Sequence, residues 1–148
     1  SELRRVFQEF ARAMGMKQRR PGSWFRRFAD VILVVELQKS NYSNAYYLNI
    51  RWWFCALGDA SIPAVSDLHV RTRPELLLGS RGEVLTRLLD LETPAQNRIR
   101  DLGVALERDL ADILAQSQSL QAVRELYRSG LLRGAAIRGP ATSLLTSQ

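Results

Sequence analysis

Two apolar segments around a short polar turn dominate the pattern of hydrophobic and polar positions along the chain. The first, over residues 31–39, begins with apolar residues at every position, which is typical of a strand covered on both faces. The second, over residues 46–55, alternates between two kinds of side chain, as a strand with two different faces does. Residues 41–44 between them are asparagine, tyrosine and serine, which favour a tight connection. The pattern therefore predicts a central β-hairpin.

The alternation in the second strand divides its side chains between a core face and an amphipathic face. The predicted core face carries Tyr46, Leu48, Ile50, Trp52 and Phe54. The amphipathic face carries Tyr47, Asn49, Arg51, Trp53 and Cys55. Asn49 and Arg51 would be costly to bury without hydrogen-bonding partners, so the second face is the more interesting one for function.

The residues before the hairpin predict one helix and one further strand. Apolar residues recur at helical spacing at Leu3, Phe7, Phe10 and Met14. Gly15 stands where a glycine commonly ends a helix. The turn signal Pro21-Gly22 then precedes a strand expected over residues 23–28.

The residues after the hairpin predict a short strand, Leu68–Arg73, reached by a connection over residues 58–66, and then helices. Ser80–Glu83 has the spacing of a capping box, and Thr93-Pro94 has that of an N-cap with proline at the first helical position. The apolar stripes expected to face the core are Leu85, Leu88 and Leu89 in the first of these helices, and Ile99, Leu102, Leu106, Leu110 and Ile113 in the second. A last helix is expected over about residues 120–129, ended by a glycine.

This order of elements predicts an α+β fold, in which an antiparallel meander carries an N-terminal helix and C-terminal helices packed on one face. A chain of 148 residues that is 46% hydrophobic is long enough for one core, so a single domain is expected. We expect the domain to span residues 1–134, strand-rich over 16–78 and helical over 80–130. Residues 135–148 are expected to form a poorly ordered tail, because Gly139-Pro140 begins a loosely patterned end.

Positive charge is concentrated in the first part of the chain. The formal net charge is +6, and basic and acidic residues balance after residue 58. An acid-free basic run contains Arg12, Lys17, Arg19, Arg20, Arg26 and Arg27. Such a run attracts an acidic partner, whether nucleic acid, a membrane surface or an acidic protein, although a solvated loop and strand edge explains it as well.

Motifs for catalysis, cofactors and metals are missing from the sequence. It has no phosphate-binding glycine loop, no zinc-ligand spacing and no nucleophile motif, and its one histidine lies near arginines rather than carboxylates. Glu107, Asp109 and Asp112 are expected on the polar side of a helix. We therefore expect no enzyme, no cofactor and no metal. The lone Cys55 and the lack of an apolar run of roughly 20 residues favour a cytoplasmic protein without a membrane span.

The candidate partner-binding residues lie on two strands. They are Tyr47, Asn49, Arg51, Trp53, His69, Arg71 and Arg73. The last three share one strand face at intervals of about 7 Å, and such donors can hold a phosphate or a carboxylate. An edge strand that uses positive charge to prevent edge-to-edge pairing has the same pattern, so both explanations stay open.

The chain resembles the bacterial DUF4304 family over about Leu3 to Leu78. The resemblance is carried by the aromatic and arginine-rich start of WFRRFADVILVVELQKSNYSNAYYLNIRWWF, by Gln38–Asn49 within it, and by the later His69–Arg73. The polar residues of Gln38–Asn49 are the most specific part, because packing alone does not demand them. Met16 stands where the family commonly has phenylalanine.

Small bacterial proteins of this kind resemble immunity proteins, which neutralise a cognate toxin by occluding its active site. That resemblance implies an acidic toxin domain as partner, because the chain is basic. A nucleic-acid-binding module that uses the run from Arg12 to Arg27 is the alternative. An accessory protein that forms homodimers through the amphipathic strand face is a third option.

Overall fold

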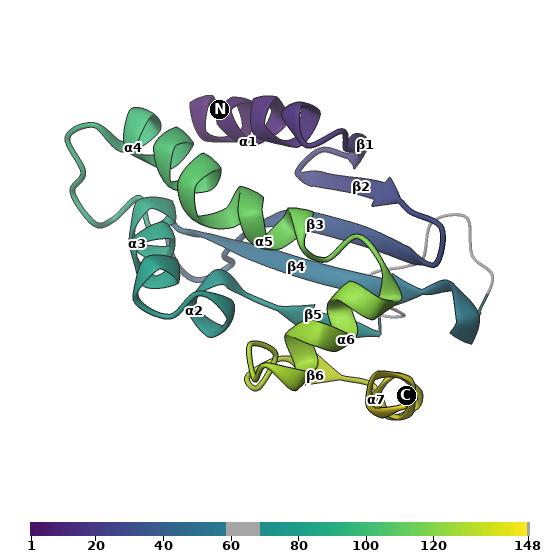
Figure 1. The fold of residues 1–148 in the computed structure, drawn as a ribbon. Coiled ribbons are helices and arrows are strands. Elements are labelled where there is room, and N and C mark those ends of the chain that lie inside the picture. Colours follow the sequence, from purple (N-terminus) through teal and green to yellow (C-terminus); the bar gives the residue numbers. More distant parts are fainter. Residues whose placement is uncertain (59–68, 148) are drawn as a thin grey trace.

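An antiparallel sheet forms the centre of the molecule. The computed structural model describes residues 1–58 and 69–147, and within them six strands lie side by side in chain order (Figure 1). The strands are β1 Lys17–Arg20, β2 Ser23–Arg27, β3 Val31–Lys39, β4 Tyr46–Phe54, β5 Val70–Thr72 and β6 Ala136–Ile137. Each neighbouring pair is antiparallel, so the predicted meander is confirmed.

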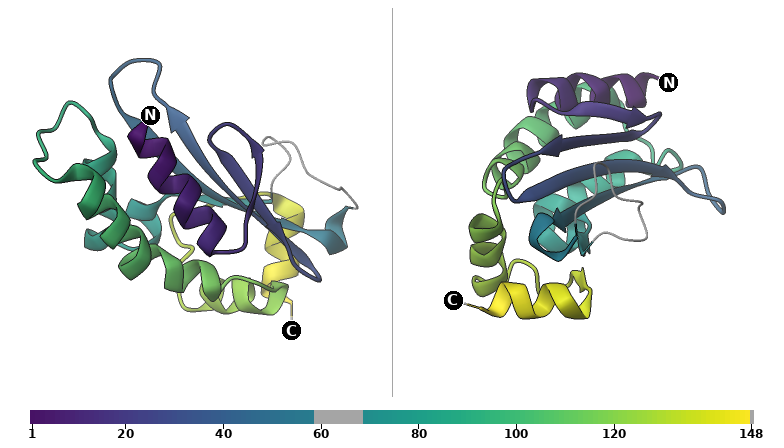
Figure 2. Two further views of the ribbon diagram at one scale, coloured as in Figure 1. Left: turned by 90° about the horizontal axis from the view of Figure 1, so that it is seen from above. Right: turned by 90° about the vertical axis from the view of Figure 1, so that its right-hand side faces the viewer.

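Helices cover one face of this sheet, as the sequence predicts. The helices are α1 Glu2–Ala13, α2 Pro74–Leu77, α3 Ser80–Leu89, α4 Arg98–Ala105, the π-helical η3 Leu106–Leu110, α5 Ala111–Ala115, α6 Leu120–Arg128 and α7 Gly139–Thr146, and a short 3-10 turn η1 Cys55–Leu57 follows β4. Figure 2 shows α4, α5 and α6 on the same side of the strands. No helix of the described ranges is long and apolar enough to cross a membrane.

The register of the hairpin assigns each side chain to a face. On the helix-covered face the cross-strand partners are Leu33 and Trp52, Val35 and Ile50, and Leu37 and Leu48. On the other face they are Val34 and Arg51, Glu36 and Asn49, and Gln38 and Tyr47. The predicted core face is therefore confirmed, and the amphipathic face points away from the helices. We call the latter the open face.

The first half of β3 has apolar side chains on both faces of the strand because both faces are packed. Val31, Leu33 and Val35 belong to the main core. On the open face Ile32 and Val34 are also fully buried, where Phe25, Trp53 and Cys55 pack against them. The remaining polar part of the open face begins at Glu36.

The predicted helical core residues are buried. Leu3, Phe7 and Phe10 of α1 lie in the core, as do Leu85, Leu88 and Leu89 of α3. In the following helices Leu102, Leu106, Leu110 and Ile113 are buried and Ile99 packs against the core. The glycines expected to end α1 and α6 both have a positive φ, 73° at Gly15 and 86° at Gly130, which glycine adopts without strain.

The capping predicted for two helix starts is wrong, although the first of these helices does begin at Ser80. α3 has Gly79 as its N-cap, and Ser80 lies inside the helix without a capping hydrogen bond. α4 begins at Arg98 rather than at Pro94. The Thr93 hydroxyl donates to the Asp90 carboxylate at 2.9 Å, and the Arg98 guanidinium binds the Thr93 carbonyl, so these residues form a closed loop in place of a first helical turn.

Four elements were not predicted: β1, α2 and the C-terminal pair β6 and α7. The expected disordered tail is wrong for most of its length, because Ala141 and Leu145 of α7 are fully buried in the core. The Arg124 guanidinium also donates to the Leu144 carbonyl at 3.0 Å, which holds the end of α7. The expected connection over residues 59–66 and Leu68 lie outside the described residues.

Asp109 is buried, although the sequence places it on a polar helix side. It lies in η3, and the wider π-helical turn rotates it inward. Its carboxylate accepts hydrogen bonds from Arg108 Nε at 3.1 Å and Nη2 at 2.9 Å, and Arg81 Nη1 lies 3.8 Å away. The Arg108 hydrogen bond lowers the pKa of the Asp109 carboxyl despite the opposing effect of burial.

Because its pKa is lowered in the folded state, Asp109 stabilises the fold above the ordinary aspartate pKa of about 3.9 and loses this effect as the pH falls through the lower folded value. Asp109→Asn should therefore reduce the free energy of unfolding at neutral pH, and the difference from the parent should shrink below about pH 4. Urea unfolding at several pH values measures this. Glu107→Gln, on an exposed neighbour, is the control, and a difference that is independent of pH would contradict the assignment.

Candidate functional site

Two adjoining pockets lie on the open face of the sheet. Each has a volume of about 470 Å³, and they share Gln38 and Arg51 in their linings. One pocket also has Arg71 and Arg73 in its lining, and the other has Arg20. We call the two pockets together the arginine groove.

Glu36 organises one half of the groove. The Arg20 guanidinium donates through Nη2 to Glu36 Oε2 at 2.8 Å, and Arg51 Nη2 lies 3.7 Å from Glu36 Oε1. Glu36 and Arg51 are both buried, with 8% and 7% of their surfaces exposed. Glu36 comes from β3 and Arg51 from β4, so the hairpin register brings this pair together.

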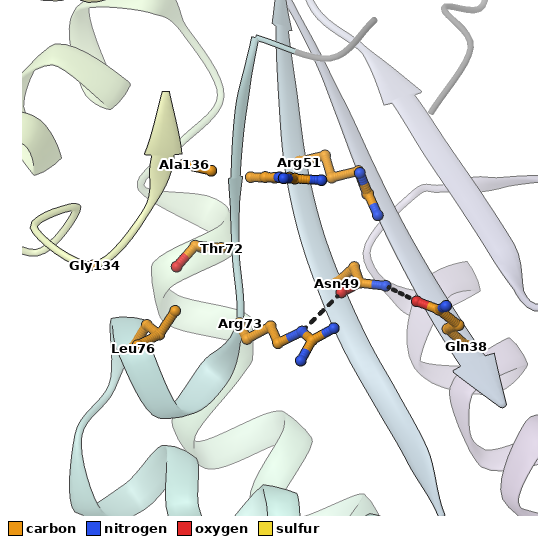
Figure 3. A pocket seen from close by; sticks show the side chains of 9 residues that line it. Gln38, Asn49, Arg51, Thr72, Arg73, Leu76, Gly134 and Ala136 are labelled. Carbon is orange, nitrogen blue, oxygen red and sulfur yellow. Dashed lines mark hydrogen bonds between the residues drawn. The ribbon is translucent and has the colours of Figure 1, made fainter. Parts of the chain in front are cut away.

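Asn49 organises the other half of the groove. Its side-chain Nδ2 donates to Gln38 Oε1 at 3.0 Å, and its Oδ1 accepts from Arg73 Nε at 3.1 Å (Figure 3). The Arg73 guanidinium also lies over the ring of Tyr47, 4.5 Å from its centroid. The buried amide therefore fixes the direction of an arginine that belongs to the next strand.

Positive charge exceeds negative charge in the groove. Glu36 is the single acidic side chain among the described residues that line it. Arg51 and Arg71 stand directly opposite each other on β4 and β5. Burial lowers the pKa of the Arg51 guanidinium, Glu36 opposes this shift, and Arg71, Arg73 and Arg20 add to it. The arginines thus repel one another, and one carboxylate does not balance them.

One wall of the groove comes from the C-terminal part of the chain. Gly134 and Ala136 line the pocket beside β5, opposite Asn49 and Arg51 in Figure 3. Leu76 of α2 lines it as well, and it is half exposed. The pairing of Ala136 with Arg71 places this wall at the edge of the arginine cluster.

The sequence matches the family described as a domain of unknown function (DUF4304) over residues 7–116. The chain belongs to the DUF4304 family. No curated protein and no solved structure gave a match. Every arginine of the groove lies within the DUF4304 region, whereas the wall formed by Gly134 and Ala136 follows it in the chain. The charged part of the groove therefore lies in the region that matches the family, and the wall lies outside it.

Most of the predicted partner-binding residues of this DUF4304 chain meet in or beside the groove. Asn49, Arg51, Arg71 and Arg73 line it, and Tyr47 packs on one of its arginines. The groove also uses Glu36, Gln38 and Arg20, which the sequence analysis did not include in this site. Glu36 and Gln38 could have been recognised from the sequence, because they are polar residues at alternate positions of an otherwise apolar strand.

Two of the predicted partner-binding residues, His69 and Trp53, are packed within the fold instead. His69 is 7% exposed, and its Nδ1 accepts a hydrogen bond from the Phe54 backbone N–H at 2.8 Å. Its ring stacks on Trp53 with a centroid distance of 4.1 Å, and Trp53 Nε1 donates to the Gly58 carbonyl. His69 and Trp53 share the side of Arg71, but they pack beside the groove and do not line it.

The basic run from Arg12 to Arg27 does not form one surface. Arg20 turns into the groove, where it meets Glu36. Arg26 donates to the Met14 carbonyl at 2.9 Å on the side covered by α1, because it stands opposite the core residue Leu33. The remaining residues of the run are distributed over α1 and the first two strands: Arg12, Lys17, Arg19 and Arg27. The described residues contain no cluster of three side chains that could hold a metal ion.

Proposed function

We propose that this DUF4304 chain is a binding protein that captures an acidic protein partner in its arginine groove, as an immunity protein does when it occludes a toxin's active site. The observation that carries the proposal is the excess of arginine over carboxylate in a groove on the sheet face opposite the helices. The planar arginine guanidinium binds a carboxylate through two parallel hydrogen bonds, which gives both energy and orientation.

The groove would bind with little loss of conformational freedom. Asn49 and Glu36 already hold three of the arginines in place, so a partner need not order them. The positive field of the chain would speed the encounter with an acidic surface, and a few anchors would supply most of the affinity. The lone Cys55 suits a reducing compartment, so we place this function in the cytoplasm.

An exposed aromatic side chain lies on the loop that follows β3. Tyr42 is 98% exposed in the β3–β4 loop, which bends away from the helices toward the side of the open face (Figure 2). The Ser40 hydroxyl accepts hydrogen bonds from the backbone N–H groups of Tyr42 and Ser43, so the loop is held in shape. An exposed tyrosine on an ordered loop is well suited to enter a pocket of a partner.

The proposal is tested by affinity capture of the tagged protein from its cells of origin, with nuclease, at low and raised salt. We expect one protein to be captured in stoichiometric amount and to stay bound after nuclease treatment and at raised salt. This captured protein should bind the purified chain one to one, and binding should inhibit the captured protein's own activity. Arg71→Glu should abolish the binding. Arg5→Glu, an equal charge change on an exposed residue of α1, should leave it within about twofold.

Equal loss of binding in both variants would contradict the groove as the interface. Bound material that disappears with nuclease or salt would instead support nucleic-acid binding, whose affinity falls steeply with salt because counterions are released.

A further inference from the structure

Three arginines of the groove are arranged at a cost to the fold. Arg51 and Arg71 are direct cross-strand partners, so their Cβ atoms are about 5 Å apart, and like charges at such positions destabilise a sheet. Arg73 follows Arg71 on the same face at about 7 Å. Packing alone gives no reason for a sheet to collect three positive side chains here, whereas a bound anion would remove the repulsion.

The hydrogen bonds divide these arginines into held and available donors. Arg51 is buried and is paired with Glu36. The guanidinium of Arg71 is exposed and makes no hydrogen bond or ion pair with the described residues. Arg73 uses Nε for Asn49 (Figure 3), and its two terminal nitrogens make no hydrogen bond with the described residues. Arg71 and Arg73 can therefore offer several donors to one ligand.

We propose that Arg71 and Arg73, with the buried Arg51 on the strand beside them, form a site for a compact oxyanion that carries at least two negative charges. Gly134 and Ala136 line one side of this site. Clustered carboxylates and phosphoryl groups share the required chemistry. The inference rests on the proposed function, since it names the group of an acidic partner that the groove takes, and that function expects carboxylates.

The site is tested with free anions. Thermal unfolding is followed in citrate, in pyrophosphate and in sodium chloride at matched ionic strength, and calorimetric titration gives Kd for citrate and pyrophosphate. We expect the parent Tm to rise by about 4 °C at a citrate concentration ten times Kd, relative to chloride.

Arg71→Gln separates the proposed site from general effects of anions on folding. Without citrate, its Tm should equal or exceed that of the parent by about 1 to 2 °C, because a like-charge pair is removed. Its response to citrate should fall to less than half. Arg5→Gln, on the outer side of α1, should respond as the parent does, which accounts for stabilisation by excluded salts.

The outcomes distinguish this inference from the proposed function. An equal citrate response in all three proteins, or a lower Tm of Arg71→Gln without anion, would overturn the oxyanion site even if a protein partner is captured. A response to pyrophosphate but not to citrate would uphold the site, and it would count against carboxylates of an acidic protein as the natural ligand. A citrate response that depends on Arg71, without any captured partner, would uphold the site and contradict the immunity function.

Discussion

Replacing Gly82 by alanine is expected to destabilise the fold by about 3 kcal/mol. Gly82 lies in α3 where this helix crosses α2, and a Cβ at this position would stand 1.9 Å from the Pro74 carbonyl oxygen and 2.7 Å from the Glu75 backbone nitrogen. Both contacts are with backbone, so no side chain can turn aside. The two helices would have to separate, which outweighs the gain of about 1 kcal/mol that alanine offers in a helix.

A second helical glycine supplies the matched control. Gly103 lies in α4, and nothing stands within 4 Å of a Cβ placed there. Gly103→Ala should therefore stabilise the fold by up to about 1 kcal/mol, through helix propensity alone. Urea unfolding of the two variants compares the same substitution with and without a backbone contact of the new Cβ. A similar fall in the free energy of unfolding of both variants would contradict the role of the contact at Gly82.

The close approach at Gly82 also positions the groove. α2 follows Arg73 directly, and its Leu76 lines the pocket. The Thr86 hydroxyl of α3 donates to the Glu75 carboxylate at 2.9 Å, which ties the same two helices together. Displacement of α2 would move Arg73 relative to Asn49, so Gly82→Ala should also weaken citrate binding, whereas Gly103→Ala should not.

The sheet and its two faces could be predicted because strand alternation is a local property. Residues 46–55 contain the alternation in their own sequence, and the turn before them is short, so the register of the hairpin follows. The separation of Trp52 from Trp53 follows from the same alternation. The helical stripes were equally local, and the burial of Leu102 and Leu110 needed no knowledge of their neighbours.

Helix starts and the C-terminal segment could not be predicted, because competing local hydrogen bonds decide the helix starts and packing against other elements decides the C-terminal segment. Thr93 has the chemistry of an N-cap, but Asp90 takes its hydroxyl. α7 has a weak pattern of its own, and it is ordered because Leu145 is buried in the core and Arg124 of α6 binds the Leu144 carbonyl. Asp109 was misplaced because a π-helical turn cannot be recognised from apolar spacing that assumes 3.6 residues per turn.

The groove was predicted in its residue types but not in its organisation. The sequence places Arg51, Arg71 and Arg73 on amphipathic strand faces. It does not show that β5 pairs with β4 so that Arg71 stands opposite Arg51, nor that Glu36 is their counter-charge. Strand pairing across residues 59–68 is a long-range property, and the wall at Gly134 and Ala136 comes from a segment expected to be disordered.

The second large effect is expected from Glu36→Gln, which removes the carboxylate that lies between Arg20 and Arg51. The Glu36 and Arg51 side chains are 10% and 8% exposed, so the substitution leaves a buried positive charge without its counter-charge. Breaking a buried ion pair from one side costs about 3 kcal/mol, more than the pair itself contributes. The free energy of unfolding, measured with urea at low salt, should fall by about this amount.

The same variant should respond more strongly to a bound anion than the parent does. Without Glu36 the groove holds four arginines and no carboxylate, so citrate should recover much of the lost stability and bind the variant more tightly than the parent. Glu9→Gln, an equal charge change on an exposed residue of α1, should alter neither stability nor citrate affinity beyond experimental scatter. If Glu36→Gln is destabilised but citrate has no greater effect on it, Glu36 serves only the fold. A larger effect means that Glu36 occupies part of an anion site that a partner's carboxylate can share.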